Sequence, residues 1–274
     1  MAKRTVFFIS DQTGVTAETL GHSLLTQFEG SEFASVTLPF LDTVDKIDGA
    51  LKLINDRAAA EGIGPIIFST LVQDNLRLRF KPSTGVLIDL FNTFLPALEK
   101  ELHAKSSHKA GRAHGLIDTT RYDQRIEATN FALNNDDGSR TQDYDRADII
   151  LVGVSRSGKT PTCLYLALTY GVYAANYPVS EDELESGKLP AVLLPNLHKV
   201  YGLTIEAKRL QQIRHQRRST GRYATMPQVS FEIRAAEAMF ARYKIKYIDA
   251  TKSSIEELAS TILANTGVER RIRP

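Results

Sequence analysis

One eight-residue pattern constrains this chain more than any other feature. Residues 153–160 read Gly-Val-Ser-Arg-Ser-Gly-Lys-Thr, which satisfies the pattern G-x-x-x-x-G-K-[ST]. The pattern predicts a phosphate-binding loop where a strand precedes it and a helix follows it. The apolar run at 149–152 and the helical pattern at 159–170 supply both, and Pro161 falls in the first helical turn, where a missing N–H is tolerated. The sequence therefore predicts a P-loop α/β domain.

The residue types in this loop suit a phosphorylated ligand. Glycines let backbone N–H groups turn toward one anion, and the helix N-terminus adds about half a unit of positive charge. Lys159 can neutralise a β- or γ-phosphate, and the Thr160 hydroxyl can hold Mg²⁺. The predicted nucleotide-binding residues are Gly153, Val154, Ser155, Arg156, Ser157, Gly158, Lys159 and Thr160.

The acidic residue that would hold magnesium is harder to identify. A conventional P-loop ATPase places it at the end of an apolar strand. Asp249, after the run 245–248, is one candidate, and Asp89 is another, although its surroundings predict a helix. Asp89 and Asp249 can equally well be interpreted as acidic residues of surface turns with no metal-binding role.

The first hundred residues alternate between strand and helix patterns. Short β-branched and aromatic runs predict strands at 5–10, 35–40 and 65–70, and helical spacing of apolar residues predicts helices at 17–28, 45–60 and 85–102. This order is typical of a parallel sheet with right-handed crossovers. We expect a Rossmann-like α/β domain over residues 1–104.

A polar and basic stretch at 103–115 separates this region from the loop, and predicts a linker over residues 105–120. Residues 121–274 should form the second domain, a P-loop kinase-like α/β unit that carries nucleotide binding and catalysis. Its expected strands are 149–152, 172–176, 192–194, 200–205 and 245–248. Its expected helices are 121–134, 159–170, 207–218, 230–243 and 254–264, with a turn at 135–138 and a cap at Ser253 or Ser254.

Composition limits the cellular compartment and the kinds of partner that this chain is expected to have. The single cysteine, Cys163, permits no intrachain disulfide and no cysteine-rich zinc site, which fits a reducing compartment such as the cytoplasm. The net charge of +2 is too small to demand a nucleic-acid partner. The apolar run at 6–9 is too short for a signal peptide, and no stretch approaches the ~18–20 residues of a membrane span. We expect a cytoplasmic protein with neither a nucleic-acid nor a membrane partner.

A basic run at 208–222 contains Lys208, Arg209, Arg214, Arg217, Arg218 and Arg222. Such a run is usually the solvated face of a helix. Its alternative role is to grip phosphates or an acidic patch on a partner protein.

Several segments of the chain resemble one bacterial family. GVSRSGKTPTCLYLA (153–167) and ANYP (175–178) are similar to the regulatory proteins of pyruvate, phosphate dikinase and phosphoenolpyruvate synthase. The segments at 7–28, YDQRIEA (122–128), DDG (136–138) and HKVYGLTI (198–205) extend the resemblance over nearly the whole chain. ANYP, HKVYGLTI and GRYAT (221–225) look closer to the synthase branch.

This resemblance implies a bifunctional enzyme that acts on one threonine of phosphoenolpyruvate synthase. In the kinase direction ADP would donate its β-phosphate, leaving AMP and an inactive partner. In the other direction inorganic phosphate would attack the phosphothreonine and yield pyrophosphate. The implied ligands are ADP, inorganic phosphate and Mg²⁺, with residues 153–160 as the ADP-binding loop.

A threonine nucleophile needs a carboxylate within hydrogen-bond reach. Asp123, in YDQRIEA, is one candidate, and the DDG pair with Asp137 is another. Together with Lys159 and Thr160, Asp123 and Asp137 complete the predicted catalytic set. The alternative interpretation of Asp-Asp-Gly is a simple turn.

Other functions stay open. The same chemistry could act on pyruvate, phosphate dikinase. The chain could also be an ATP-dependent small-molecule kinase, which the late position of the loop counts against, or a nucleotide-sensing module without catalysis. A homodimer is expected by analogy with regulators of oligomeric enzymes.

Overall fold

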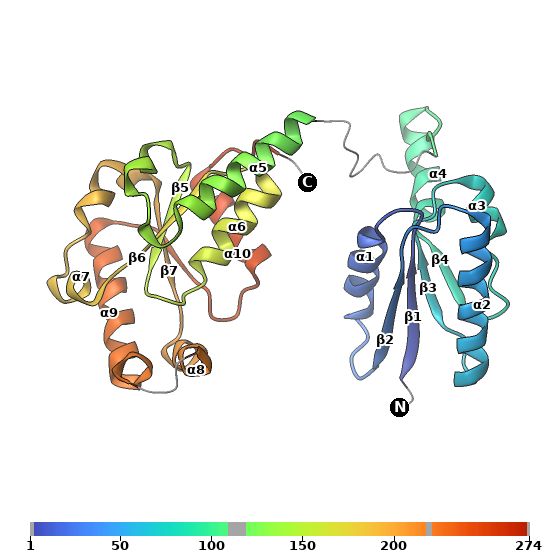
Figure 1. Cartoon of the computed structure of the whole chain (residues 1–274), viewed down its shortest axis with the longest axis horizontal. Helices are drawn as coiled ribbons and strands as arrows, with labels where there is room; N and C mark the ends of the chain where they lie inside the picture. Colours follow the sequence, from blue (N-terminus) through green and yellow to red (C-terminus); the bar gives the residue numbers. More distant parts are fainter. Residues whose placement is uncertain (1–2, 109–118, 218–220, 273–274) are drawn as a thin grey trace. The chain divides into compact units, whose positions relative to one another are not determined.

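The computed structural model of the chain describes residues 3–108, 119–217 and 221–272. It contains two compact units, Met1–Gly115 and Leu116–Pro274, and each unit has its own four-stranded parallel sheet (Figure 1). The α/β fold class predicted from the sequence is therefore confirmed. None of the described helices combines the length and the apolar character needed to cross a membrane.

The N-terminal unit alternates strands and helices along the chain. Its strands, in the order β2-β1-β3-β4, are β1 (Arg4–Ile9), β2 (Phe33–Leu38), β3 (Ile66–Ser69) and β4 (Val86–Asp89). Its helices are α1 (Val15–Leu25), α2 (Val44–Glu61), α3 (Asp74–Arg79) and α4 (Leu90–Leu102). Phe7 and Ile9 of β1 pack with α2 and α3 on one face, and Val6 and Phe8 pack with α1 and α4 on the other. Helices thus cover both faces of a buried sheet.

The second unit repeats this strand order as β6-β5-β7-β8. Its strands are β5 (Ile149–Gly153), β6 (Ala174–Pro178), β7 (Val200–Thr204) and β8 (Tyr247–Asp249). Its α-helices are α5 (Thr119–Asn134), α6 (Lys159–Tyr170), α7 (Glu181–Ser186), α8 (Ala207–Arg217), α9 (Met226–Tyr243) and α10 (Ile255–Thr266). Its 3-10 segments are η1 (Asp136–Gly138), η2 (Thr141–Arg146), η3 (Ala191–Lys199) and η4 (Arg222–Ala224).

The central strand β5 carries the loop into the middle of this unit. Ile150 and Val152 pack under α7, α8 and α9, while Ile149 and Leu151 pack against α6 and α10 on the opposite face. From β5 the chain goes to β6 on one side and then returns to β7 on the other. In open parallel sheets, ligands bind beyond the carboxyl ends of the strands at such a reversal. The fold therefore places the loop after β5 where a ligand site is expected.

Two element predictions are wrong. Residues 85–102 were expected to form one helix, but Val86–Asp89 is the strand β4, in register with Ile66–Ser69. The helix begins only at Leu90, where the Asp89 carboxylate caps it by accepting the Asn92 N–H at 2.9 Å. A short apolar run such as VLID fits either element by its period, and the neighbouring strand decided between them.

The expected strand at 192–194 is instead part of the 3-10 segment η3. Pro190 and Pro195 flank these residues, and proline can donate no hydrogen bond to a sheet. The short helix α3 was not predicted. The predicted cap of the last helix is confirmed, because Ser254 and Glu257 form a reciprocal capping box at α10.

Candidate functional site

The loop after β5 starts at a glycine that lies against the neighbouring strand. A Cβ on Gly153 would stand 2.3 Å from the Leu203 carbonyl oxygen on β7 and 3.1 Å from Ser157 Oγ. Further along, Arg156 and Gly158 take left-handed φ values of 74° and 97°. Left-handed residues at alternate positions turn backbone N–H groups toward one point, as in anion-binding nests. Helix α6 begins at the next residue without a side-chain cap, so its first N–H groups stay available.

We expect Gly153→Ala to lower the free energy of unfolding by about 1–3 kcal/mol, because the added methyl group would displace the backbone of β7. Gly49→Ala is the matched control. Gly49 is an exposed residue of α2 with nothing within 4 Å of its virtual Cβ, so the change should raise stability by up to about 1 kcal/mol. Urea denaturation of both variants measures the difference. A Gly153→Ala protein as stable as the wild type would show that β7 does not constrain the loop.

Lys159 lies inside the loop as a buried cation. Its side chain is 4% exposed, and its Nζ donates a hydrogen bond to the Val154 carbonyl at 2.9 Å. Burial lowers the pKa of Lys159 to about 8, against the opposing effect of the nearby Asp137 and Asp136 carboxylates. An ammonium held here can neutralise a phosphate that enters the nest.

Thr160, the last residue of the loop pattern, contacts an acidic residue from another element. Its hydroxyl donates to Asp136 Oδ1 at 2.7 Å, and the Asn176 amide donates to the same carboxylate oxygen. Asp136 belongs to η1, before β5, whereas Asn176 belongs to β6, beside β5. The structure thus brings together a loop hydroxyl and a carboxylate that lie 24 residues apart in the sequence.

Asn176 organises the DDG turn around the loop. Its side chain is fully buried, and its Oδ1 accepts the Asp137 N–H at 3.1 Å. Its backbone N–H donates to the Asn135 carbonyl at 3.2 Å, and its carbonyl accepts the Tyr144 hydroxyl at 3.0 Å. These contacts hold the turn in one place. The ANYP motif was the only sign of this residue in the sequence, and it carried no indication of its role.

Oxygen donors of this kind suit Mg²⁺. Magnesium is usually held by one or two carboxylates and hydroxyls together with substrate phosphates and water, rather than by a dedicated protein cage. Among the described residues no group of three or more histidine, cysteine, aspartate or glutamate side chains could hold a metal. The Thr160 hydroxyl and the Asp136 carboxylate fit the smaller donor set that a nucleotide-bound Mg²⁺ requires.

The predicted acidic residues lie in different places. Asp137 follows Asp136 in the turn, is exposed, and takes a left-handed φ of 49°. Asp123 lies on the exposed part of α5. Neither carboxylate contacts Thr160 as Asp136 does.

The two strand-end candidates for magnesium are engaged elsewhere. Asp89 belongs to the N-terminal unit, where it ends β4 and caps α4, so the expectation of a helical position is wrong. Asp249 ends the outer strand β8 and accepts the Thr251 N–H at 2.8 Å. No sequence signal marks Asp136 as a magnesium ligand, since it precedes the loop in a turn instead of ending a strand.

Two further residues contact the loop: Arg214, which the sequence marked only as a member of the basic run, and Tyr223, which was part of no site prediction. Arg214 on α8 is fully buried and donates to the Ser155 carbonyl at 3.1 Å. The Tyr223 hydroxyl lies 3.0 Å from Ser155 Oγ. Among the described residues of the basic run, Arg214 is thus buried whereas Lys208, Arg209, Arg217 and Arg222 are exposed, a difference that charge alone could not indicate.

Cys163 on α6 is buried at 1% exposure, as expected for a small core residue. Burial raises the pKa of its thiol, and the thiol donates to the Ala175 carbonyl at 3.4 Å. The cysteine therefore serves packing beneath the loop.

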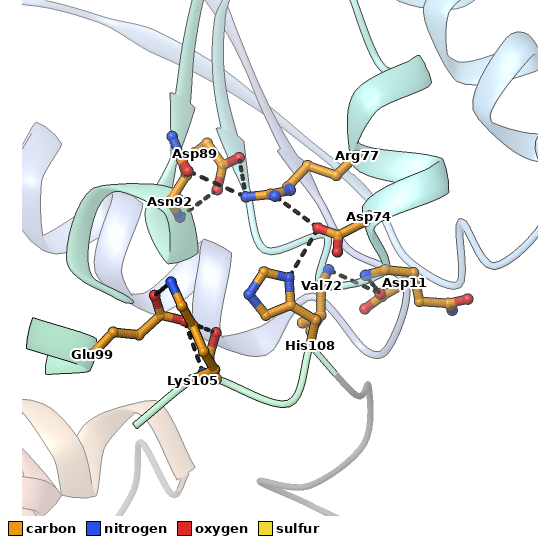
Figure 2. A network of polar contacts seen from close by, with 11 residues as sticks. Asp11, Val72, Asp74, Arg77, Asp89, Asn92, Glu99, Lys105 and His108 are labelled. Carbon is orange, nitrogen blue, oxygen red and sulfur yellow. Dashed lines mark hydrogen bonds and ion pairs between the residues drawn. The ribbon is translucent and has the colours of Figure 1, made fainter. Parts of the chain in front are cut away.

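A second polar network lies in the N-terminal unit (Figure 2). Arg77 pairs with Asp74 at 2.7 Å and lies 3.8 Å from Asp89, and His108 Nδ1 lies 2.9 Å from Asp74. In the same unit, the Asp11 carboxylate accepts the backbone N–H groups of Val72 and Gln73 at 3.0 and 3.3 Å, which joins the ends of β1 and β3.

The network also holds residues that the sequence assigned to a linker. The N–H and hydroxyl of Ser106 donate to Glu99 at 2.8 and 2.6 Å, and these bonds, with help from Lys105, lower the pKa of Glu99 to about 2. Residues 105–108 thus lie against the N-terminal unit. Residues 109–118 of the predicted linker are outside the described residues, and its last two residues, 119–120, belong to α5.

Comparison with known proteins shows which family the chain is similar to. The family model described as "Kinase/pyrophosphorylase" matches residues 6–263. A protein of Pseudomonas aeruginosa (strain LESB58) is 51% identical over 271 residues, covering 99% of both chains. Proteins of Stutzerimonas stutzeri (strain A1501) and Ectopseudomonas mendocina (strain ymp) are 51% and 50% identical, covering 99% of this chain and 100% of theirs.

All three relatives carry the name "Putative phosphoenolpyruvate synthase regulatory protein". The match extends over both units of the fold and includes the loop, the DDG turn and the strand β6 that supplies Asn176. The family resemblance found in the sequence is confirmed by these matches. The chain belongs to the kinase/pyrophosphorylase family.

Proposed function

We propose that this protein transfers the β-phosphate of ADP to a threonine of phosphoenolpyruvate synthase, and removes it again with inorganic phosphate. The observation that carries the proposal is the contact between Thr160 and Asp136 at the mouth of a loop that already holds the buried Lys159. This arrangement combines a phosphate nest, a cation and a magnesium-type donor pair, which are the parts that phosphoryl transfer requires. The names of the relatives support the synthase as the partner, in preference to the dikinase.

In the kinase direction the loop would hold the β-phosphate of ADP. A bond forms between the threonine oxygen and the β-phosphorus, while the bond from that phosphorus to the bridging oxygen breaks and AMP leaves with this oxygen. Lys159 and the loop N–H groups stabilise the charge on the transferring group. Bound Mg²⁺ would supply further charge neutralisation, with Thr160 and Asp136 as its protein ligands.

The proton of the threonine hydroxyl needs an acceptor on the open side of the loop. We assign the role of proton acceptor to the Asp137 carboxylate. Asp137 is exposed beside the loop, whereas the Asp136 carboxylate already accepts hydrogen bonds from Thr160 and Asn176. This assignment keeps the prediction made from the sequence and gives the two carboxylates of the DDG turn different roles.

In the opposite direction the same nest would hold inorganic phosphate. Its oxygen attacks the phosphorus of the phosphothreonine, the bond to the threonine oxygen breaks, and this oxygen regains a proton while pyrophosphate forms. A phosphate nest does not distinguish a free phosphate from the terminal phosphate of ADP, since both present the same anionic oxygens. One site can therefore serve both reactions.

A labelling experiment tests the proposed function. Purified phosphoenolpyruvate synthase and pyruvate, phosphate dikinase are each incubated with the protein, Mg²⁺ and either β-labelled ADP or γ-labelled ATP. We expect label on a threonine of the synthase from ADP, and its release as pyrophosphate when unlabelled phosphate is added. ATP turnover without a protein acceptor would instead indicate a small-molecule kinase. Nucleotide-dependent binding of the synthase without transfer of label would indicate a sensing module.

A further inference from the structure

Arg214 is a buried cation that the proposed reaction does not use. Its side chain is fully buried on α8, and its Nη2 pairs with Glu232 Oε2 on α9 at 2.6 Å. The other carboxylate oxygen of Glu232 accepts the Gln228 amide at 3.1 Å. A buried arginine is rare unless its charge is paired, and this pair meets that requirement.

The two Nη groups of Arg214 also donate to the phosphate loop and the segment beside it. Nη2 also donates to the Ser155 carbonyl at 3.1 Å, and Nη1 donates to the Tyr223 carbonyl at 2.9 Å. The guanidinium carbon lies 4.1 Å from the centre of the Tyr223 ring. The Tyr223 hydroxyl in turn lies 3.0 Å from Ser155 Oγ. Arg214, Ser155 and Tyr223 thus form a closed cycle of contacts.

This cycle acts on the orientation of one peptide group of the loop. In a trans peptide the carbonyl and the following N–H point in opposite directions. Because Arg214 holds the Ser155 carbonyl, the N–H of Arg156 must point away from Arg214. The left-handed φ of 74° at Arg156 continues the same turn of the chain. The contacts therefore select the peptide orientation that a nest needs.

We propose that Arg214 and Tyr223 are positioning residues that preorganise the phosphate loop. Arg214 holds the loop backbone through the Ser155 carbonyl, and Tyr223 holds the Ser155 side chain while its ring is held by Arg214. Glu232 fixes the guanidinium that both contacts depend on. The proposal rests on the phosphate site of the proposed function, but not on the identity of the protein substrate.

A double-mutant cycle on ADP binding tests this role. The variants are Tyr223→Phe, Ser155→Ala and the double variant, and calorimetry measures ADP affinity at constant Mg²⁺. Loss of one hydrogen bond predicts a roughly three- to tenfold weaker affinity for each single variant. The double variant should bind no more weakly than either single one, because all three lack the same hydrogen bond. Multiplying effects would show that the two hydroxyls act independently and would overturn the proposal.

Arg214→Lys and Arg214→Met extend the test to the guanidinium. Lysine keeps the charge but cannot reach three acceptors in fixed geometry, so we expect both variants to weaken ADP binding by at least about tenfold. The matched control is Arg234→Met on α9, an exposed arginine whose Nε donates to Ser230 of its own helix at 3.1 Å. Thermal unfolding of each variant separates a folding defect from a loop defect, and Tyr223→Phe keeps the test decisive if the Arg214 variants do not fold.

The possible outcomes separate this inference from the proposed function. Wild-type protein that binds ADP but labels neither partner enzyme would contradict the proposed function. The double-mutant cycle on ADP affinity would still measure whether Arg214 and Tyr223 position the loop. Unchanged ADP affinity in Tyr223→Phe and Ser155→Ala, with normal transfer by the wild type, would overturn positioning alone. Wild-type protein that binds no ADP would overturn both.

Discussion

Lys159→Met should lower the rate of phosphoryl transfer at least about 100-fold in both directions and leave the protein folded. The ammonium is the buried cation of the loop, and electrostatic stabilisers of a transition state contribute on this scale. Methionine has a similar length and no charge, so it avoids the cost of burying an ammonium whose pKa is already lowered to about 8. Steady-state labelling assays in each direction, with denaturation curves, measure the two effects.

The control for this variant is Lys188→Met, which removes an exposed lysine after α7. It should change neither direction by more than about twofold. If Lys159→Met abolished one direction and spared the other, the two reactions would not share one phosphate site.

The same lysine predicts a pH dependence. Burial favours the neutral amine, so the pKa of Lys159 falls from 10.5 to about 8 and the free protein loses this charge as the pH rises through about 8. The value of kcat/KM for ADP should decline above that pH, and Lys159→Met should not show the decline. The free energy of unfolding depends on pH in the opposite direction. Between pH 8 and 10.5 the unfolded chain binds more protons at Lys159 than the folded protein does, so the contribution of Lys159 to stability rises with pH.

Asp136→Asn should lower kcat/KM at limiting Mg²⁺ by at least about 100-fold and raise the Mg²⁺ concentration needed for half-maximal activity. Asparagine keeps an oxygen that can accept the hydrogen bonds of Thr160 and Asn176, so the turn should stay in place. What is lost is the negative charge that a magnesium ion requires. A magnesium titration of the transfer rate measures the shift.

Asp137→Asn is the informative comparison, because it changes the next residue of the same turn. As the assigned proton acceptor, Asp137 should affect kcat by about 100-fold without moving the Mg²⁺ dependence. Asp182→Asn, an exposed aspartate of α7, serves as the control for loss of one surface charge. Equal Mg²⁺ shifts in Asp136→Asn and Asp137→Asn would show that the two carboxylates do not have separate roles. Asp123→Asn tests the remaining acidic residue predicted from the sequence.

The sequence predicted the loop well because its determinants are contiguous. Strand β5, the residues 153–160 and helix α6 appear where their patterns placed them, with the helix at Lys159–Tyr170 as expected. Buried strands and helix starts follow local rules of period and capping. The errors at 85–89 and 192–194 occurred where short apolar runs fit more than one element and only a neighbouring strand or a flanking proline decided.

By itself, then, the sequence determined the fold class, the family and the strand–loop–helix unit at 149–170, because each is read from short contiguous segments of the chain. The tertiary structure decided which groups surround the loop. Thr160 meets Asp136 across 24 residues, and Ser155 meets Arg214 across 59. No period or spacing records such pairs, since they arise from the packing of η1, β6 and α8 around β5 and α6. The choice of Asp136 for Thr160, and the burial of one arginine in a basic run, follow from that packing.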